Sequence, residues 1–309
     1  MIFQSTIAKP LSITGIGLHS GRPVTMLLRP ASAGTGIVFH RRAGDRIAAI
    51  EATVDNVVDT RMATVLGKQG LTVSTVEHFL AALSVLGIDN LDIDIDGPEV
   101  PIMDGSAEPF LDLIREAGIC CLQRSRKYLA IRKPVSVIDG EKRVTLIPSR
   151  FFRITYDIAF EHPAISLQRR TVKVAPDTFE QEIAAARTFG FLEEVEYLKA
   201  NGLAQGGSLE NAVVINKQGV MNPEGFRYND ECVRHKILDA IGDFSLLGYP
   251  LLGHVKAYKA GHDIHCKAVQ RVLQDKECWQ LVEFSEKDLY EALNSAAPTY
   301  ATDMALSEA

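Results

Sequence analysis

The sequence has few cysteines, and their arrangement excludes two kinds of site. Its 309 residues include an odd number of cysteines with no Cys-x-x-Cys pair: Cys120, Cys121, Cys232, Cys266 and Cys278. Disulfide frameworks and cysteine zinc sites need paired or regularly spaced thiols. We therefore interpret all five as reduced thiols, which is typical of a reducing compartment.

The sequence also lacks a block of one charge and a long apolar run. The net charge is −6, and the 33 Lys and Arg residues are scattered among 39 Asp and Glu residues. Nucleic acid is therefore excluded as an expected partner, because its binding requires a basic patch. The N-terminus lacks the basic start and apolar stretch of a signal peptide, and no later segment has the length and apolarity to span a membrane. We expect a cytoplasmic monomer.

The composition that remains is that of a folded globular protein. Hydrophobic residues make up 46% of the chain and charged residues 23%. Such a chain can bury a core, and it is neither disordered nor of low complexity. The length suits two domains of ordinary size.

The first half is expected to contain several short strands and then two helices. Alternating runs separated by Gly and Pro continue to about residue 73. The segment STVEHFLAALSVLG then offers Ser74 as an N-cap, Glu77 three residues later and Gly87 as a terminator, which is typical of a helix. LDIDIDG alternates like a half-exposed strand, and SAEPFLDLIREAG carries the signals of a second helix.

The same order of elements returns from about Lys127. KRVTLIPS is similar to RPVTMLLRPA, and a helix RHKILDAIGDF, a strand HVKAYKAG and a helix IHCKAVQRVLQ follow it. We therefore predict an α+β protein with similar domains at 1–126 and 127–275, and a partly disordered C-terminal extension at 276–309.

An extra segment interrupts the second half at about residues 188–216. FGFLEEVEYLKANGLAQGG has helical periodicity that ends at Gly202, and ENAVVIN is typical of a following strand. Together they predict an inserted βαβ-type subregion. The insertion has two interpretations at this point: it forms part of the wall of a pocket, or it is a surface excursion without a functional role.

His235 and Asp239 have the spacing of two metal ligands. They lie four residues apart in the predicted helix RHKILDAIGDF, so both side chains project from one face, about one turn apart. The spacing by itself is weak evidence, because a His and an Asp four residues apart more often form a simple surface pair.

The surroundings of this pair favour the metal. Ile237 and Leu238 lie around it, and His78 lies in another predicted helix beside an apolar stripe. If the two helices are equivalent elements of the two halves, His78, His235 and Asp239 converge and leave one position for water, as in catalytic zinc sites. Two imidazoles and a carboxylate suit Zn²⁺ or Fe²⁺, and the sequence does not distinguish between these two ions.

Two side chains near the ligands are candidates for proton transfer. Glu77 directly precedes His78 and suits a general base, unless it caps its helix together with Ser74. His262 follows the strand HVKAYKAG and is expected in a loop, where it can protonate a leaving amine.

The neighbours of His262 have two interpretations each. Asp243 is four residues after Asp239 and is either the group that orients His262 or a surface carboxylate. His262 and His265 are otherwise ordinary solvated loop histidines.

Five blocks taken together resemble one family. STVEHFLAAL, RHKILDAIGDF, the GLHSG turn, RTFGF and KAGH occur within residues 1–275 in a pattern similar to that of the UDP-3-O-acyl-N-acetylglucosamine deacetylases. The resemblance implies a zinc-dependent hydrolase that removes the N-acetyl group of UDP-3-O-acyl-N-acetylglucosamine to give UDP-3-O-acyl-glucosamine and acetate, the committed step of lipid A biosynthesis. It also implies two βα-layered domains packed helix face to helix face, with the site between them.

The resemblance further implies roles for individual residues. At the metal these are the ligands His78, His235 and Asp239, the general base Glu77, and the general acid His262 held by Asp243. Around the substrate they are Thr188 and Lys236 at the developing oxyanion, Lys259 at the nucleotide diphosphate, and Phe189 and Met62 along the groove.

For the insertion, the resemblance implies a passage for the acyl chain. An apolar lining would hold the chain by burial, worth about 0.8 kcal/mol per CH₂ group; its expected members are Leu192, Val195, Leu198 and Val214. The chain departs from the usual family pattern at Ala63, often a cysteine, and near His265, usually an asparagine.

Two other functions are compatible with the same residues. One is a zinc amidohydrolase that acts on another N-acetyl sugar. The other is a metal-binding scaffold without turnover.

Overall fold

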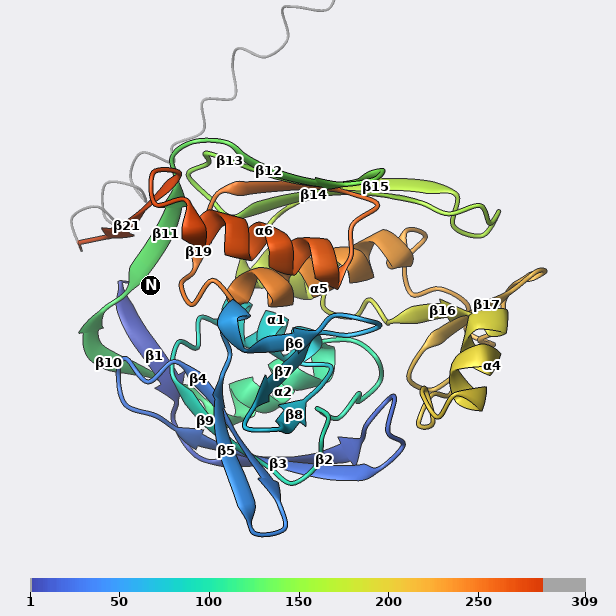
Figure 1. Cartoon of the computed structure of the whole chain (residues 1–309), viewed down its shortest axis with the longest axis horizontal. Coiled ribbons are helices and arrows are strands. Elements are labelled where there is room, and N and C mark those ends of the chain that lie inside the picture. The colour runs from blue at the N-terminus through green and yellow to red at the C-terminus, as the bar shows by residue number, and fades with distance from the viewer. Residues whose placement is uncertain (1, 286–309) are drawn as a thin grey trace, which may run out of the picture.

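The structure is a computed structural model that describes residues 2–285, and it has helices enclosed between two sheets (Figure 1). The first sheet has the strand order β2 (Leu11–Ile16), β3 (Pro23–Pro30), β9 (Leu91–Ile95), β4 (Ile37–Ala43) and β5 (Arg46–Glu51). The second has the order β12 (Val135–Asp139), β13 (Lys142–Ile147), β20 (His254–Tyr258), β14 (Arg153–Ala159) and β15 (Leu167–Lys173). In each sheet the central strand is antiparallel to one neighbour and parallel to the other. The predicted α+β fold with two similar halves is confirmed.

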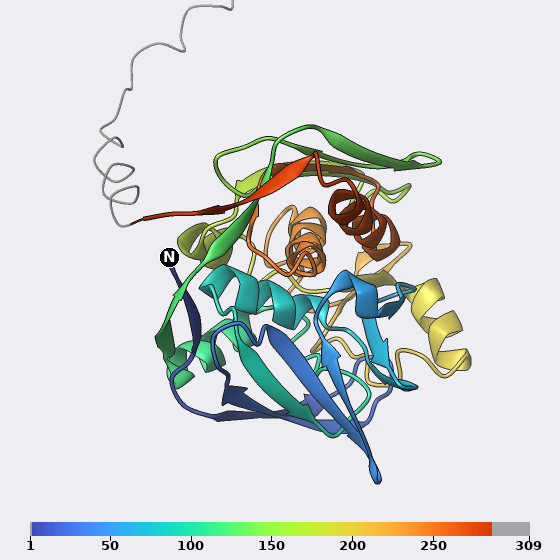
Figure 2. The ribbon, with the colours of Figure 1, turned by 60° about the vertical axis from the view of Figure 1, so that its left-hand side comes forward.

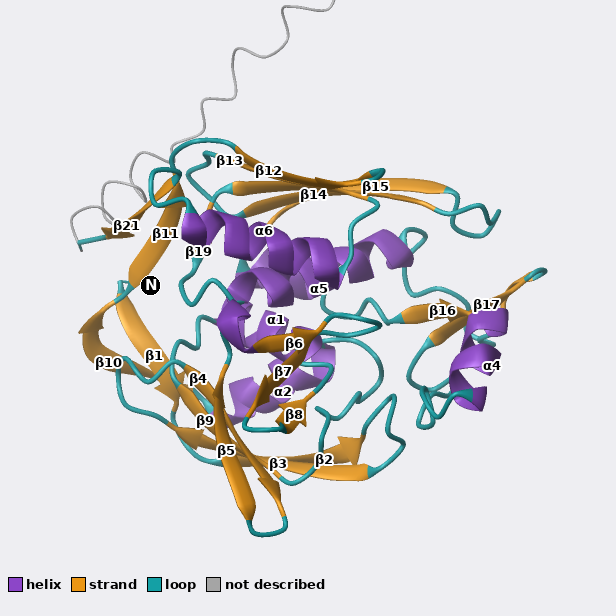
Figure 3. Cartoon of the chain, viewed as in Figure 1, coloured by secondary structure: helices purple, strands orange, loops and turns teal. Residues whose placement is uncertain are grey.

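The helices of the two halves face each other across the middle of the molecule. Figures 2 and 3 show α1 (Glu77–Leu86) and α2 (Glu108–Ala117) next to the first sheet, and α5 (Glu231–Ser245) and α6 (His262–Gln274) next to the second. The most extensive contact between the halves is made by α1 and α5. Gly242 makes it possible, because its missing side chain leaves room for the backbone of Glu77.

Strand β9 illustrates how the sequence pattern produces a sheet. Leu91, Ile93 and Ile95 are buried, whereas Asp92 and Asp94 alternate with them and are only half-buried. Asp94 accepts a hydrogen bond of 2.7 Å from Arg29 on the neighbouring strand β3. The predicted half-exposed strand is confirmed, because an alternation of period two places the apolar side chains on the helix-covered face.

The predicted N-cap of the first helix is wrong by two residues, because Val76 and not Ser74 is the N-cap. Helix α1 begins at Glu77, and Ser74 instead forms a β-bridge with Glu99. Thr75 has a φ of 57°, which interrupts any helix that starts at Ser74. The predicted end is right, because Gly87 adopts the left-handed conformation that closes α1.

The start of α6 also differs from the expectation. The helix includes His262 as its first residue, so His262 and His265 both lie in the first turn rather than in a loop. The reason is local: Gly261 is extended, and the backbone N–H of His265 already donates to its carbonyl at 3.0 Å.

The insertion has the predicted strand, helix and strand. They are β16 (Phe189–Phe191), α4 (Leu192–Ala200) and β17 (Val213–Asn216), and β16 and β17 are parallel. A short strand β18 (Gly219–Val220) pairs with β17. In Figure 1 this subregion lies to the side of the two main sheets.

Smaller elements connect these units. They are β1 (Phe3–Ile7) paired with β10 (Ile119–Ser125), the sheet of β6 (Val57–Asp59), β7 (Val65–Lys68) and β8 (Leu71–Val73), η1 (Val54–Asn56), α3 (Pro176–Glu182), and the sheet of β19 (Leu251–Leu252), β11 (Lys127–Ile131) and β21 (Trp279–Glu283). Strand β21 belongs to the predicted extension and is antiparallel to β11. The expected disorder after Glu286 lies outside the described residues.

Two further expectations concern the described part of the chain. All five cysteines are free thiols, as predicted. Within residues 2–285 no helix is long and apolar enough to cross a membrane.

Candidate metal centre

Helices α1 and α5 bring the three predicted ligands together. Oδ1 of Asp239 lies 3.2 Å from Nε2 of His235 and 3.4 Å from Nε2 of His78. The two imidazole rings are nearly perpendicular, with centroids 4.8 Å apart. All three side chains are buried, and their ligand atoms lie within 4.8 Å of one another. The convergence expected from the two halves therefore occurs.

The chemistry of these atoms fits a divalent cation. Oδ1 of Asp239 is buried without a hydrogen-bond partner, although two imidazole nitrogens face it. Nδ1 of His235 donates a hydrogen bond of 3.0 Å to the carbonyl of Ala186. The lone pair of its other nitrogen, Nε2, is then directed at Oδ1 of Asp239. A buried carboxylate oxygen without a donor is costly, and a cation between these atoms removes the cost.

Glu77 lies beside the ligands, and its carboxylate is held by the backbone of Thr64. Its Oε2 accepts a hydrogen bond of 3.1 Å from the backbone N–H of Thr64, and its Oε1 lies 3.8 Å from Nε2 of His262. Burial raises the pKa of this carboxyl group. The alternative role of Glu77 as a helix cap with Ser74 is wrong, because Ser74 is in a β-bridge outside the helix.

His262 is held by a fully buried carboxylate. Its Nδ1 donates to Oδ2 of Asp243 at 2.8 Å, and Oδ1 of Asp243 accepts a hydrogen bond of 2.5 Å from the hydroxyl of Thr64. Burial lowers the pKa of His262, but the charges of Asp243 and Glu77 outweigh it and raise this pKa to about 9. Asp243 is therefore not a surface carboxylate, and His262 is a buried imidazolium that can deliver a proton from Nε2.

His265 belongs to the same cluster, contrary to its interpretation as a solvated loop residue. Its Nδ1 lies 2.8 Å from Oδ2 of Asp243, and its Nε2 lies 3.1 Å from the hydroxyl of Tyr156 on β14. The spacing of three residues from His262 on one helix was a sequence signal for this position. Tyr156 had no such signal, because its strand is distant in sequence.

Lys236 and Phe189 border the metal ligands. Nζ of Lys236 donates to Oδ2 of Asp239 at 2.8 Å and lies 5.8 Å from the ring centroid of Phe189. The Phe189 ring is 6.4 Å from the ring of His235. Thr188 precedes Phe189, is half-buried, and is bound through its backbone to Gly105. The structure thus places Lys236 and Phe189 at the site.

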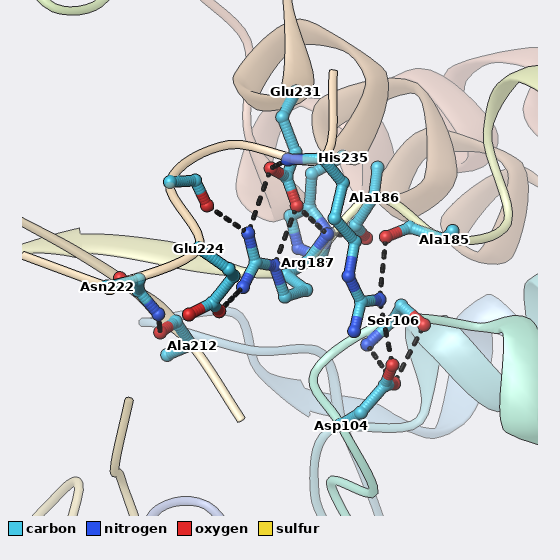
Figure 4. Close-up of polar contacts among 12 residues, drawn as sticks. Asp104, Ser106, Ala185, Ala186, Arg187, Ala212, Asn222, Glu224, Glu231 and His235 are labelled. Atoms are coloured by element: carbon cyan, nitrogen blue, oxygen red, sulfur yellow. Dashed lines mark hydrogen bonds and ion pairs between the residues drawn. The ribbon is translucent and has the colours of Figure 1, made fainter. Parts of the chain in front are cut away.

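A buried ion pair that the sequence analysis missed fixes the segment around Ala186. Figure 4 shows Arg187 between Glu231 and Glu224. Both the backbone N–H and Nε of Arg187 donate to Oε1 of Glu231 at 2.9 Å. Glu231 lies one turn before His235 on α5, so this pair holds the Ala186 carbonyl opposite the imidazole that donates to it. Arg187 directly precedes Thr188 in RTFGF, which was the available signal.

Lys259 and Met62 lie outside the hydrogen-bonded cluster. Lys259 forms an ion pair of 2.8 Å with Glu141 and lines a surface hollow of about 540 Å³ together with Phe160 and His162. Met62 is 53% exposed and has a φ of 70°. The roles predicted for both residues stay predictions.

The residues expected along the acyl passage lie on the insertion. Leu192, Val195 and Leu198 are half-buried at intervals of three residues on α4, and Val214 is buried on β17. Helix α4 packs on β16 and β17, and the spacing of Leu192, Val195 and Leu198 places these three side chains on one face of the helix. Their contact with a substrate stays a prediction.

Comparison with known proteins gives one family. The model of the family described as UDP-3-O-acyl N-acetylglycosamine deacetylase matches residues 4–274. Curated proteins named UDP-3-O-acyl-N-acetylglucosamine deacetylase are 66% identical over 286 residues in Syntrophotalea carbinolica, covering 93% of both chains, and 53% identical over 298 residues in Geobacter sp. strain M21, covering 96% of this chain and 98% of the relative. One from Myxococcus xanthus is 52% identical over 286 residues, covering 93% and 91%. The chain belongs to the UDP-3-O-acyl N-acetylglycosamine deacetylase family.

Proposed function

We propose that this protein hydrolyses the N-acetyl group of UDP-3-O-acyl-N-acetylglucosamine to give UDP-3-O-acyl-glucosamine and acetate, the committed step of lipid A biosynthesis. The names of the relatives support this substrate. One observation of the site carries the proposal. The unpaired Oδ1 of Asp239 faces two imidazole nitrogens, and a carboxylate and an imidazolium lie together beside it.

The metal that these ligands would hold is Zn²⁺, with Fe²⁺ as the alternative. His78, His235 and Asp239 are the donors, and two imidazoles with one carboxylate suit both ions. When bound, the ion would supply Lewis-acid chemistry, because it lowers the pKa of water and polarises a carbonyl oxygen.

Glu77 and His262 then divide the proton transfers. Glu77 removes a proton from the attacking water, and its buried position with a raised pKa makes its carboxylate a stronger base than an exposed one. His262 carries the proton that the departing nitrogen needs, and Asp243 keeps its ring oriented through Nδ1. Acid and base are separate residues, so both transfers can proceed within one turnover.

Lys236 and Thr188 are the proposed partners of the negative charge that develops on the carbonyl oxygen. The ammonium group of Lys236 is already held beside Asp239, so it needs no reorganisation to stabilise an oxyanion there. Phe189 meets the ring of His235 in a T-shaped contact and adds an apolar surface beside the ligands. Met62 lies in the loop that precedes Thr64 and would border the same groove.

The two ends of the substrate would use different parts of the second half. Lys259 provides a cation at the hollow beside Phe160 and His162, which suits a nucleotide diphosphate. The apolar face of α4 and β17 suits the acyl chain. The pocket interpretation of the insertion is thereby preferred to a surface excursion. We further propose that the protein works as a monomer in the cytoplasm.

The test is acetate release from UDP-3-O-acyl-N-acetylglucosamine by the zinc-loaded protein. We expect turnover by the wild type and losses of more than about 100-fold in Glu77→Ala and His262→Ala. Full rates in both variants would contradict the acid–base assignment. A wild type that binds zinc without releasing acetate would be a scaffold, and equal rates on UDP-N-acetylglucosamine without the acyl chain would point to another N-acetyl sugar.

A further inference from the structure

A chain of hydrogen bonds continues from the site into the core of the second half. It starts at His262, passes through Asp243 and His265, and ends at Tyr156. Asp243, His265 and Tyr156 are completely or almost completely buried, and they lie on α5, α6 and β14 respectively. The last two residues have no part in the reaction described above.

The direction of each bond follows from the chemistry of its atoms. Burial raises the pKa of Asp243, but the charge on His262 and the bonds from both histidines lower it to about 2, so the carboxylate only accepts. His262 and His265 must therefore each donate from Nδ1 to Oδ2 of Asp243. Burial also lowers the pKa of His265, which leaves Nε2 of its neutral ring as an acceptor for the hydroxyl proton of Tyr156.

These bonds leave Asp243 no freedom to rotate. Oδ2 accepts hydrogen bonds of 2.8 Å from Nδ1 of His262 and from Nδ1 of His265. Oδ1 accepts a hydrogen bond of 2.5 Å from the hydroxyl of Thr64. Any rotation of the carboxylate breaks at least one bond to a buried donor, which is costly in a medium of low polarity. His265 is itself held by ring contacts with Tyr156 and Phe244, whose centroids are each 5.8 Å away.

We propose that Tyr156 and His265 are positioning residues for the proton donor. The Tyr156 hydroxyl selects the Nδ1–H tautomer of His265, His265 fixes the second lone pair of Oδ2 on Asp243, and the fixed carboxylate keeps Nε2 of His262 directed at the departing nitrogen. The pair acts through Asp243 and does not touch the substrate. This role rests on the proposed deacetylase function.

The kinetic test uses three variants at the pair. His265→Leu removes the donor to Asp243, and we expect kcat to fall about 10- to 100-fold, with KM and zinc content within about two-fold of wild type. His265→Asn keeps a side-chain N–H at a similar distance from the helix and should recover most of this loss. Tyr156→Phe removes only the hydroxyl and should lower kcat about five-fold.

His254→Leu is the matched control. His254 also lies in the second half and is hydrogen-bonded to Thr155, the neighbour of Tyr156, at 2.8 Å. It should leave kcat unchanged and report the general cost of losing a histidine near this sheet. The proposal is overturned if His265→Leu retains full kcat, if its activity falls only in proportion to folded or metal-loaded protein, or if His265→Asn is as slow as His265→Leu.

A second measurement does not depend on activity. Nitrogen-15 NMR of the imidazoles in the metal-free wild type should show His265 as the neutral Nδ1–H tautomer, with exchange between tautomers in Tyr156→Phe. An Nε2–H tautomer in the wild type would reverse the bond to Tyr156 and overturn the proposal. If the wild type shows the expected tautomer but releases no acetate, the deacetylase function fails while the hydrogen-bonded arrangement stands.

Discussion

Gly242 on α5 lies directly against the backbone of Glu77 on α1. A Cβ atom at residue 242 would overlap the carbonyl oxygen of Glu77 and lie 2.8 Å from its Cα. The backbones of the two central helices are therefore in direct contact at the residue that we assign as the general base. Because both partners in this contact are backbone, no side-chain movement can relieve an added methyl group.

Gly242→Ala should separate the two helices and displace Glu77. We expect a loss of stability of about 1–3 kcal/mol, as for other overpacked cores, and a drop in kcat of at least about ten-fold. Thermal unfolding and steady-state kinetics on the zinc-loaded protein measure both effects. An alanine variant with wild-type stability and kcat would contradict the close contact.

Asp243→Asn should change the pH dependence of the reaction. The charge of Asp243 is the largest of the contributions that raise the pKa of His262 to about 9. Because the acid must be protonated, activity is lost as the pH rises through that value. In the variant the basic limb of the kcat profile should move to lower pH by more than one unit. A basic limb in the same place would show that another group is the acid.

The same raised pKa affects folding of the metal-free protein. The folded-state pKa of His262 is about 9, and its unfolded value is about 6.5. The resulting stabilisation is complete below pH 6.5 and is lost as the pH rises from about 6.5 to 9. Urea unfolding across this range should show a decline that is smaller in His262→Ala. Equal pH dependence in both proteins would contradict this assignment.

Glu231→Gln should weaken metal binding without touching a ligand. The carboxylate of Glu231 neutralises Arg187 and accepts a hydrogen bond from its backbone N–H. These two interactions hold the neighbouring carbonyl of Ala186, which accepts the hydrogen bond from His235. We expect a loss of zinc affinity of about 10- to 100-fold, measured by competition with a chelator. Glu224→Gln is the matched control, because Glu224 pairs with the same arginine but is 53% exposed in its side chain. Equal losses in the two variants would refute the positioning of His235.

Asp239→Ala should abolish stoichiometric zinc binding. The variant removes the only carboxylate of the proposed ligand set and leaves two neutral imidazoles. Metal analysis after gel filtration measures the result. Retention of full affinity would remove Asp239 from the ligands.

Leu198→Glu should raise KM for substrates with a long acyl chain. Leu198 is half-buried on the face of α4 that contains Leu192 and Val195, so a charge there would lie in the proposed passage. We expect an increase of about ten-fold that disappears as the chain is shortened. Tyr197→Glu is the control, because its side chain is 70% exposed on the same helix. If both variants raise KM equally, the passage does not follow this face.

Local sequence signals predicted most of the elements, and they singled out three side chains that the structure brings together. The spacing of His235 and Asp239 defines one face of a helix whatever surrounds it, and Gly87 ends α1 because glycine accepts a positive φ. The repeated order of strands and helices gave a reason for His78 to meet these two residues. Such features depend on neighbours within one or two turns, so they are readable from the chain alone.

Contacts between distant segments decided the rest. Ser74 does not cap the first helix, because it forms a β-bridge with Glu99. His262, which was expected in a loop, lies in the first turn of a helix. The partners of Asp243 come from elements up to 179 residues away, including the hydroxyl of Thr64. The sequence by itself determined which side chains are available as candidate metal ligands and proton carriers. Only tertiary packing decided which of them are buried, neutral or charged, because desolvation and hydrogen bonding depend on segments that no local pattern brings together.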